Sequence, residues 1–370
     1  MPVEPYTAEA LRAAGVPTHV DVAREEPWAV RPEDIGSGDV LALRALGMGD
    51  ALTGIAPLRG LRRLAPGSRL VLAAPAGVGG WLARLGVVDA VLPTPGLVPL
   101  GPIRGGQIAV DLHGNGPASR GLLTATDPGR LIGFDCPEVG HAGPPWHRDE
   151  HEVHRWCRLV SDAGGPCGPE DLRLTDPADR RDRTLDGSSD DSPGGSSGRA
   201  PGGPVVIHPG AAAPARRWPV GRWTAVARAL AEDGHRVVVT GSADEAALTA
   251  EVAGSTPGAT DAGGALDLDA LTDLVRGAGL VLSGDTGIAH LATALATPSV
   301  VLFGPVPPRW WGPLIDPHLH HVLWHGDPDA DSWGDPHGDV VDPRLDAVRT
   351  DEVLGSAFDL LSHDTGRTTS

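Results

Sequence analysis

Short apolar segments alternate with amphipathic segments along most of the chain, and this alternation constrains its fold more than any other feature. Segments of strand length stand at residues 40–45, 69–74, 88–92 and 107–112 of the first half, and at 205–208, 237–240, 280–283 and 299–303 of the second. Helical patterns fall at residues 51–64, 81–85, 151–163, 223–233, 243–253, 268–277, 286–296 and 349–362. This order predicts parallel sheets with helices on both faces. Pro57 predicts a kink within its helix, and Gly234 predicts a helix end.

A polar segment divides the alternation into two halves. Residues 176–204 contain the run Asp-Gly-Ser-Ser-Asp-Asp-Ser-Pro-Gly-Gly-Ser-Ser-Gly and almost no apolar side chain, which predicts a flexible linker. A chain of 370 residues also favours two domains. We therefore expect an α/β fold with an N-terminal extension (1–35), a first Rossmann-like domain (36–175), the linker, a second Rossmann-like domain (205–345), and a C-terminal helix and tail (346–370). Ligands are expected where the strands of such sheets end.

Composition excludes several classes of function. The net charge is −18 and lysine is absent, so a broad surface for nucleic acid or anionic membrane is not expected, although a local basic pocket is allowed. The sequence shows no apolar run of about 18–20 residues and no secretory signal at its start, which predicts a cytoplasmic protein without a transmembrane segment. Three cysteines, Cys136, Cys157 and Cys167, form neither a disulfide framework nor a zinc motif.

The first candidate site is the segment Leu-Gly-Met-Gly-Asp that ends at Asp50. This carboxylate follows a strand and a glycine turn and opens a helix. A helix N-cap is one interpretation, because aspartate accepts the unpaired N–H groups there. A general base at a strand end is the other.

Two further segments of the second half suit a phosphate and a ribose. A strand and a loop of small residues precede Arg216 and Arg217, so backbone N–H groups and guanidinium groups could meet phosphate oxygens, although a surface arginine pair is the plainer interpretation. Glu245 follows the strand and turn Val-Thr-Gly-Ser-Ala-Asp. It could bind ribose hydroxyls or only complement a helix dipole.

The segment Ser-Gly-Asp-Thr-Gly-Ile-Ala-His, which contains Asp285, Thr286, Gly287 and His290, forms the fourth candidate. A strand precedes it and a helix follows, so the N–H groups of the helix start offer an anion site. Asp285 could be only a cap, and a lone helical histidine is more often structural. Together with Arg216 the segment predicts a cradle for a diphosphate.

Two clusters suggest metal sites, and neither is supported. Asp327, Asp329 and Asp331 lack the glycine and closing glutamate spacing of an EF-hand loop. The histidines at 141, 147, 151 and 154 include a pair at helical spacing, but an ordinary helix explains them better. We expect no metal and no cofactor.

Several motifs in one order resemble glycosyltransferase family 9, the ADP-heptose:lipopolysaccharide heptosyltransferases. The resemblance covers roughly residues 39–361. Its C-terminal motifs are His208-Pro-Gly, Arg216-Arg-Trp-Pro, Val239-Thr-Gly with Glu245, Ser283-Gly-Asp-Thr-Gly-Ile-Ala-His-Leu-Ala, and Val301-Leu-Phe-Gly-Pro with Trp311-Gly-Pro. The N-terminal motifs are Leu46-Gly-Met-Gly-Asp50, Val110-Asp-Leu-His-Gly and Arg130-Leu-Ile-Gly-Phe-Asp135.

The resemblance implies a GT-B fold and an inverting, metal-independent transfer of heptose or a similar sugar from a nucleotide-diphosphate donor, expected to be ADP-linked, to a glycan or small-molecule acceptor. Asp50 would be the base. Arg216 would take the place of a phosphate-binding lysine, Glu245 that of the ribose contact, and Asp285, Thr286, Gly287 and His290 that of the donor-site motif.

Two other functions remain open. A non-catalytic GT-B protein would hold a nucleotide sugar without transferring it. An NAD-dependent Rossmann oxidoreductase would use the glycines Gly77, Gly79 and Gly80, although the dinucleotide fingerprint is incomplete there.

Overall fold

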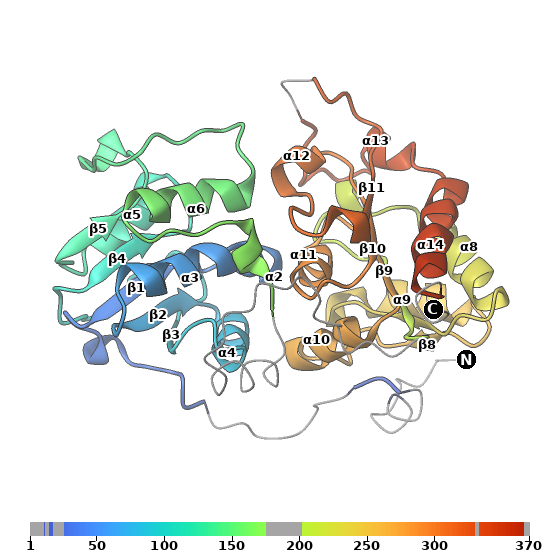
Figure 1. Ribbon diagram of the computed structural model, residues 1–370, viewed down its shortest axis with the longest axis horizontal. Coiled ribbons are helices and arrows are strands. Elements are labelled where there is room, and N and C mark those ends of the chain that lie inside the picture. Colours follow the sequence, from blue (N-terminus) through green and yellow to red (C-terminus); the bar gives the residue numbers. More distant parts are fainter. Residues whose placement is uncertain (1–10, 12–14, 18–25, 175–201, 330–332, 366–370) are drawn as a thin grey trace, which may run out of the picture. The chain divides into compact units, whose positions relative to one another are not determined.

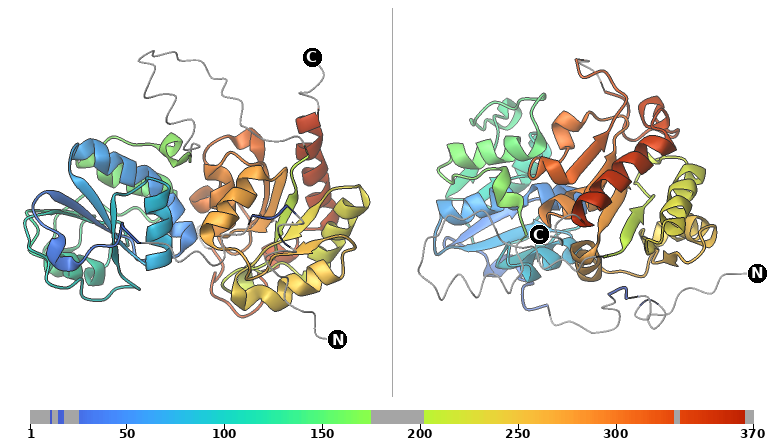
Figure 2. Two further views of the ribbon diagram at one scale, coloured as in Figure 1. Left: turned by 90° about the horizontal axis from the view of Figure 1, so that it is seen from below. Right: turned by 45° about the vertical axis from the view of Figure 1, so that its right-hand side comes forward.

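The computed structural model describes residues 11, 15–17, 26–174, 202–329 and 333–365. The chain divides into two compact units, one of which is Ala23–Leu174 and the other of which includes Thr175–Ser370. Each unit holds one sheet whose paired strands all run parallel (Figures 1 and 2). The predicted α/β class with two parallel sheets is confirmed.

The N-terminal unit is built on a five-stranded sheet of order β3-β2-β1-β4-β5. Its strands are β1 (Asp39–Leu43), β2 (Arg69–Ala74), β3 (Ala90–Pro93), β4 (Ile108–Asp111) and β5 (Arg130–Ile132). Its α-helices are α2 (Met48–Thr53), α3 (Ile55–Leu64), α4 (Ala76–Arg84), α5 (Pro117–Thr124) and α6 (Glu152–Asp162). The short η1 (Pro32–Asp34), η2 (Pro137–Val139) and η3 (Pro169–Leu172) complete it.

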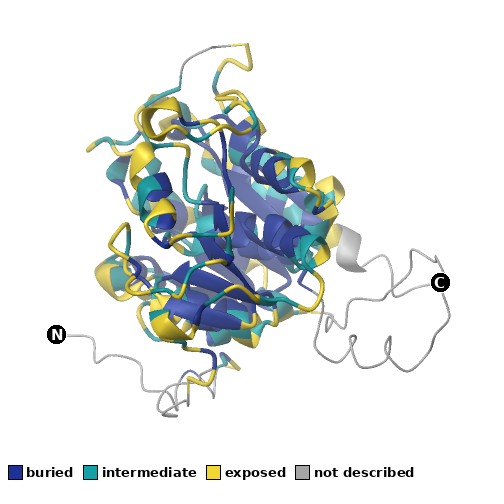
Figure 3. Cartoon of the chain, turned by 90° about the vertical axis from the view of Figure 1, so that its left-hand side faces the viewer, coloured by how far each residue is buried: buried dark blue, intermediate teal, exposed yellow. Residues whose placement is uncertain are grey.

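The central strands of this sheet are buried on both faces (Figure 3). Leu41 and Leu43 of β1 pack with Val71 of β2 and Leu123 of α5 in one core cluster. Their neighbours Val40 and Ala42 are buried as well. Burial on both faces explains why these strands are continuous apolar runs and not alternating ones.

The helix expected over residues 51–64 is interrupted at Gly54 and not kinked at Pro57. Gly54 ends α2 and precedes α3, and it is crowded by the side chain of Arg44, whose Cδ would stand 2.9 Å from an added Cβ. Pro57 lies in the first turn of α3, where a missing N–H removes no helical hydrogen bond. The side chain of Arg44 therefore fits only because residue 54 lacks one.

The residues before β1 already pack on this sheet. Ala29 forms a bridge with Val91 of β3, and the buried ring of Trp28 lies against Gly80. A Cβ on Gly80 would stand 2.2 Å from that ring, so the glycine allows α4 and Trp28 to approach. The sequence pattern also allows a short helix over residues 7–14, which lies outside the described residues apart from Leu11.

The C-terminal unit is built on a six-stranded sheet of order β11-β10-β9-β6-β7-β8. Its strands are β6 (Val205–His208), β7 (Val237–Val239), β8 (Thr260–Asp261), β9 (Leu280–Gly284), β10 (Ser299–Leu302) and β11 (His320–Leu323). Its α-helices are α8 (Val220–Glu232), α9 (Ala246–Gly254), α10 (Leu268–Gly277), α11 (Gly287–Ala294), α12 (Pro308–Trp311), α13 (Pro343–Asp346) and α14 (Thr350–Thr365). Short 3-10 turns are η4 (Pro214–Arg216), η5 (Ala243–Glu245) and η6 (Pro317–Leu319).

Helices cover both faces of this second sheet. Alternate strand residues such as Ile207 and Leu282 pack with α8, α9 and α14 in one apolar cluster. Val301 of β10 packs instead with Ala289 of α11. This alternation of side-chain direction along each strand is what lets one short apolar run bury against two helix layers.

The linker and the absence of a transmembrane segment are the remaining structural expectations. The linker predicted over 176–204 falls almost wholly there, and only Gly202, Gly203 and Pro204 are described. Among the helices that the structure describes, none is both long and apolar enough to cross a membrane.

Candidate active site

The order of the strands marks one edge of each sheet as the place for a ligand. In the N-terminal sheet, β1 has β2 and β3 on one side and β4 and β5 on the other. In the C-terminal sheet, β6 has β7 and β8 on one side and β9, β10 and β11 on the other. The loops after β1 and β4, and those after β6 and β9, therefore diverge at a topological switch point, where parallel sheets usually bind ligands.

Asp50 lies in the loop and helix that follow β1. The N-cap of α2 is Gly47, so the interpretation of Asp50 as N-cap is wrong, and the carboxylate belongs to the first helical turn. Its side chain is 34% exposed, and its Oδ1 lies 3.8 Å from Nη2 of Arg44. Asp50 thus offers carboxylate oxygens to a ligand while resting near a buried cation.

Arg44, the residue after β1, is held by a ring of acceptors in the interior. Its Nε donates to the backbone oxygen of Asp50 at 2.5 Å, and its Nη1 donates to the backbone oxygen of Leu112. Its Nη2 donates to Oγ1 of Thr53 at 2.9 Å and to Oε1 of Glu152 at 3.2 Å. A buried guanidinium group needs such partners, because an unpaired buried charge is strongly unfavourable.

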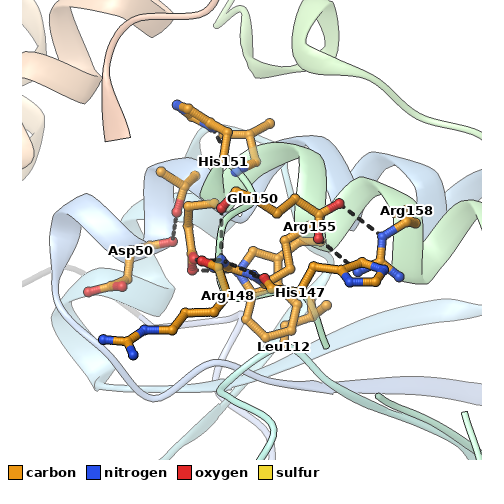
Figure 4. A network of polar contacts seen from close by, with 12 residues as sticks. Asp50, Leu112, His147, Arg148, Glu150, His151, Arg155 and Arg158 are labelled. Atoms are coloured by element: carbon orange, nitrogen blue, oxygen red, sulfur yellow. Dashed lines mark hydrogen bonds and ion pairs between the residues drawn. The ribbon is translucent and has the colours of Figure 1, made fainter. Parts of the chain in front are cut away.

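Figure 4 shows this polar network from Asp50 at one end to Arg158 at the other. Glu152 accepts from the indole N–H of Trp156 at 2.6 Å and also from Arg155, whose Nη2 donates to the backbone oxygen of Glu150 at 2.7 Å. His151 begins α6 as its N-cap, with its Nδ1 accepting from the N–H of Val153. The cap holds the start of α6, and the hydrogen bonds hold the buried carboxylate of Glu152 in one position.

Electrostatics suit Asp50 to proton transfer. Burial raises the pKa of this carboxyl group above its ordinary value, nearby Arg44 opposes the rise, and Glu152 adds to it. A carboxylate with a raised pKa is a stronger base than an exposed one. The side chain remains partly open to solvent.

His113, in the loop after β4, faces the same carboxylate. Its Nδ1 accepts the backbone N–H of Ala45 at 3.2 Å, which places the proton of the neutral ring on Nε2. Burial lowers the pKa of His113, while the charge of Asp111 acts in the opposite direction. The ring therefore stays neutral near pH 7 and adds a hydrogen-bond donor to this edge of the sheet.

Arg216 and Asp285 meet in the C-terminal unit, as the predicted phosphate cradle requires. Nη1 of Arg216 lies 3.4 Å from the backbone oxygen of Asp285. The buried Nε of Arg216 has no hydrogen-bond partner among the described residues. Burial raises the pKa of Asp285 to about 6, and Arg216 acts to lower it. An arginine that keeps a buried donor unused beside a carboxyl group with a raised pKa is suited to receive an anion.

The start of α11 adds backbone donors at the same edge. Thr286 is the N-cap of this helix and Gly287 its first residue, but the threonine side chain makes no cap hydrogen bond. Its Oγ1 lies 3.4 Å from the backbone oxygen of Gly284 instead. Ala289 donates its N–H to the backbone oxygen of Thr286 at 3.0 Å, so the helix start offers the N–H groups of Gly287 and Ile288 to another acceptor, and the helix dipole favours a negative one.

Glu245 follows β7 and closes a capping box with Ser242. Its Oε2 accepts the backbone N–H of Ser242 at 2.8 Å and the hydroxyl of Ser242 at 2.9 Å. A Cβ on Gly210 would stand 2.1 Å from its Oε1, so this oxygen lies against the loop that follows β6. Burial acts to raise the pKa of Glu245, but the Ser242 hydrogen bonds, His208 and Arg217 lower it below its ordinary value. Oε2 therefore caps the helix start at Ser242, and Oε1 lies beside Gly210 in the loop after β6.

His290 lies on α11, where its ring packs 5.9 Å from the ring of Trp311 on α12. The structure brings Arg216, Asp285, Thr286 and Gly287 together and places Glu245 beside Gly210 of the same β6 loop. Asp50 belongs to the N-terminal unit. Residue types alone did not single out Arg44, Glu152, His113 or His208. Arg44 could have been found from the sequence, because it is a basic residue directly after an apolar strand.

The other interpretations of the sequence were a metal site and a dinucleotide site. Within the described ranges, no three His, Cys, Asp or Glu side chains are grouped to hold a metal ion. The glycines that suggested a dinucleotide site lie inside α4, and both Gly79 and Gly80 serve packing. A Cβ on Gly79 would stand 2.5 Å from Val91, as one on Gly80 would crowd Trp28.

Comparison with known proteins agrees with this arrangement. The model of glycosyltransferase family 9 (heptosyltransferase) matches residues 143–328, which is half of the chain. Lipooligosaccharide heptosyltransferase 2 of Haemophilus influenzae is 28% identical over 152 residues, covering 38% of this chain and 44% of that protein. The chain thus matches less than half of the length of that curated relative.

Solved structures show the same fold. The glycosyl transferase family 9 protein from Veillonella parvula superposes with a TM-score of 0.67 at 17% identity, covering 90% of this chain and 99% of that one. The E. coli ADP-heptose LPS heptosyltransferase II gives 0.63 at 20% identity, covering 88% and 99%. The predicted GT-B architecture is confirmed by these likenesses. On the family match, this chain belongs to glycosyltransferase family 9.

Proposed function

We propose that the protein transfers heptose or a similar sugar from an ADP-linked donor to a hydroxyl group of a glycan or small molecule. The observation that carries the proposal is the cradle in the C-terminal unit, where Arg216 keeps its buried Nε unused beside Asp285 and the uncapped start of α11. ADP-heptose is the donor named for one E. coli protein of the same fold.

In this proposal Asp50 takes the proton of the acceptor hydroxyl while the hydroxyl oxygen attacks the anomeric carbon of the donor. The bond from that carbon to the diphosphate oxygen breaks, and the bonding electrons leave with the diphosphate. Attack from the face opposite the diphosphate inverts the anomeric centre. The raised pKa of Asp50 favours the proton transfer.

The leaving diphosphate gains negative charge as the bond breaks. Arg216 and the N–H groups at the start of α11 would stabilise that charge without a metal ion. The free Oε1 of Glu245 would accept from ribose hydroxyls, because it already faces the loop after β6. His290 and Trp311 would border the same helix start.

The test is a panel of ligands and a transfer assay on the full chain. Melting temperatures are measured with ADP, UDP, GDP, NAD and ADP-heptose, since a ligand that binds only the native state raises its melting temperature. Stabilisation by ADP and more by ADP-heptose, with release of ADP when an acceptor is added, is the expected result. Stabilisation by NAD alone would overturn the proposal. Binding without any transfer across a broad acceptor panel would leave the non-catalytic alternative.

A further inference from the structure

We propose that Arg44 and Glu152 are positioning residues that set the basicity of Asp50 by acting on it with opposite charges. The inference rests on the proposed function, because it assigns a base role to Asp50. The observation that carries it is the sharing of one buried guanidinium group between two carboxylates, Asp50 at 3.8 Å and Glu152 at 3.2 Å.

The ion pair between Arg44 and Asp50 is a long one, with 3.8 Å between Nη2 of Arg44 and Oδ1 of Asp50. All three of its nitrogens already donate, to the backbone oxygens of Asp50 and Leu112 and to Thr53 and Glu152. Its side chain is only 1% exposed, and its guanidinium group lies 5.2 Å from the ring centre of Trp156. The cation therefore acts on the Asp50 carboxylate mainly through its charge, and the side chain of Asp50, which is 34% exposed, remains accessible to an acceptor hydroxyl.

Glu152 keeps the guanidinium group in place and offsets its charge. Its Oε1 receives both Arg44 and the Trp156 indole, and its Oε2 receives Arg155. At 8% exposure its negative charge is screened little by solvent. Without Glu152, the full charge of Arg44 would stabilise ionised Asp50 and make it a weaker base.

The charged groups that face Asp50 come from three elements besides its own helix. Arg44 at the end of β1 lowers the pKa of Asp50, Glu152 at the start of α6 raises it, and His113 after β4 lowers it slightly. His113 contributes little charge near pH 7, since burial lowers its own pKa. The pair Arg44 and Glu152 thus controls the balance, on top of the larger effect of burial.

The sign of each change follows. Arg44→Gln removes the cation and should raise the pKa of Asp50 by about one unit, a usual effect for an opposite charge at this distance. Glu152→Gln removes the offsetting anion and should lower it by about half a unit. The double variant should return close to wild type, and Arg44→Lys should stay near wild type because its charge is kept. A role limited to folding would not give opposite shifts from two residues of one network.

Two readouts on the full chain test this. The first is a 13C NMR titration of protein labelled at aspartate Cγ, with the Asp50 signal assigned by its loss in Asp50→Asn. The second is the acidic limb of the kcat/KM profile for transfer from ADP-heptose. Opposite shifts for Arg44→Gln and Glu152→Gln in the NMR titration are expected, and the acidic limb should follow them.

Shifts in one direction, or none, in the NMR titration would overturn the positioning role. If Glu152→Gln does not fold, the upward shift in Arg44→Gln still decides the matter, and its absence refutes the proposal. If the pKa of Asp50 shifts in the NMR titration while the acidic limb of the kcat/KM profile stays in place, Arg44 and Glu152 do act on Asp50. In that case Asp50 is not the base. Failure of the proposed function is thereby separated from failure of this inference.

Discussion

Nη1 of Arg216 donates to the backbone oxygen of Asp285 across 3.4 Å, and this contact joins the loop after β6 to the turn after β9. The strands β6 and β9 are neighbours in the C-terminal sheet. The chain continues from β6 toward one edge of the sheet and from β9 toward the other. The contact brings a guanidinium group beside a helix start, although the sequence places them about 70 residues apart.

Arg216→Gln should weaken binding of ADP at least about 10-fold, because it removes a charge-assisted contact to phosphate. Isothermal titration calorimetry measures the affinity. Arg276→Gln is the matched control, since Arg276 pairs with Asp273 on the surface of α10 and should leave the affinity unchanged. Equal affinity for ADP in wild type and Arg216→Gln would remove Arg216 from the donor site.

Binding of ADP-heptose should weaken as the pH rises from about 5 to 7.5. Asp285, with a pKa of about 6 raised by burial, is mostly protonated below this value and mostly charged above it. A diphosphate nearby raises that pKa further, so binding takes up a proton and loses affinity once Asp285 ionises. Calorimetry across this range should show the decline, and Asp285→Asn should flatten it. A decline that persists unchanged in Asp285→Asn would assign the effect to another group.

Asp50→Asn should lower kcat for transfer by about 100-fold or more, the usual contribution of a general base, while ADP affinity stays within about twofold. The neutral amide keeps the shape of the side chain but cannot take the acceptor proton. Release of ADP in the presence of acceptor measures kcat. Asp162→Asn, at an exposed carboxylate at the end of α6, should leave kcat unchanged. Undiminished turnover in Asp50→Asn would rule out its role as base.

Glu245→Gln should weaken ADP about 10-fold and leave inorganic pyrophosphate unaffected, because the carboxylate is assigned to the ribose. Competition by the two ligands, measured by calorimetry, separates the contacts. Ser242→Ala is the control: it removes a donor to Oε2 of Glu245 and keeps the carboxylate, so it should change ADP affinity little. An equal loss for ADP and pyrophosphate would place Glu245 at the phosphates or in the fold alone.

Gly80→Ala should lower the free energy of unfolding by about 1–3 kcal/mol, because a Cβ there would stand 2.2 Å from the Trp28 ring. Gly77→Ala in the same helix meets no atom within 4 Å and should leave stability unchanged or raise it by up to about 1 kcal/mol. Urea denaturation measures both. A similar small effect from both variants would mean that the packing of Trp28 on α4 does not constrain residue 80.

Local sequence patterns were enough to locate most of the central strands and several helices. The helix expected over residues 268–277 is α10, and apolar runs of strand length located β1, β2, β6, β7, β9 and β10 to within one or two residues. The residues of the donor cradle also follow from local order, since Arg216 and Asp285 each follow a strand and small residues and precede a helix. The short β5, β8 and β11 were missed because Arg130, Asp261 and the pair His320 and His321 leave no apolar run there, and α5 was missed because Pro117 and Gly121 have low helix propensity.

The sequence by itself determined the fold class and where each chemical group stands along the chain, because apolar periodicity and turn residues act over a few positions. Tertiary structure alone decided the order of the strands, the break at Gly54 beneath Arg44, and the meeting of Arg44 with Glu152, which are 108 residues apart. It also decided that Gly47 and not Asp50 caps α2. Contacts between distant segments form only when the core packs. They bury charged side chains whose partners cannot be predicted from the local sequence.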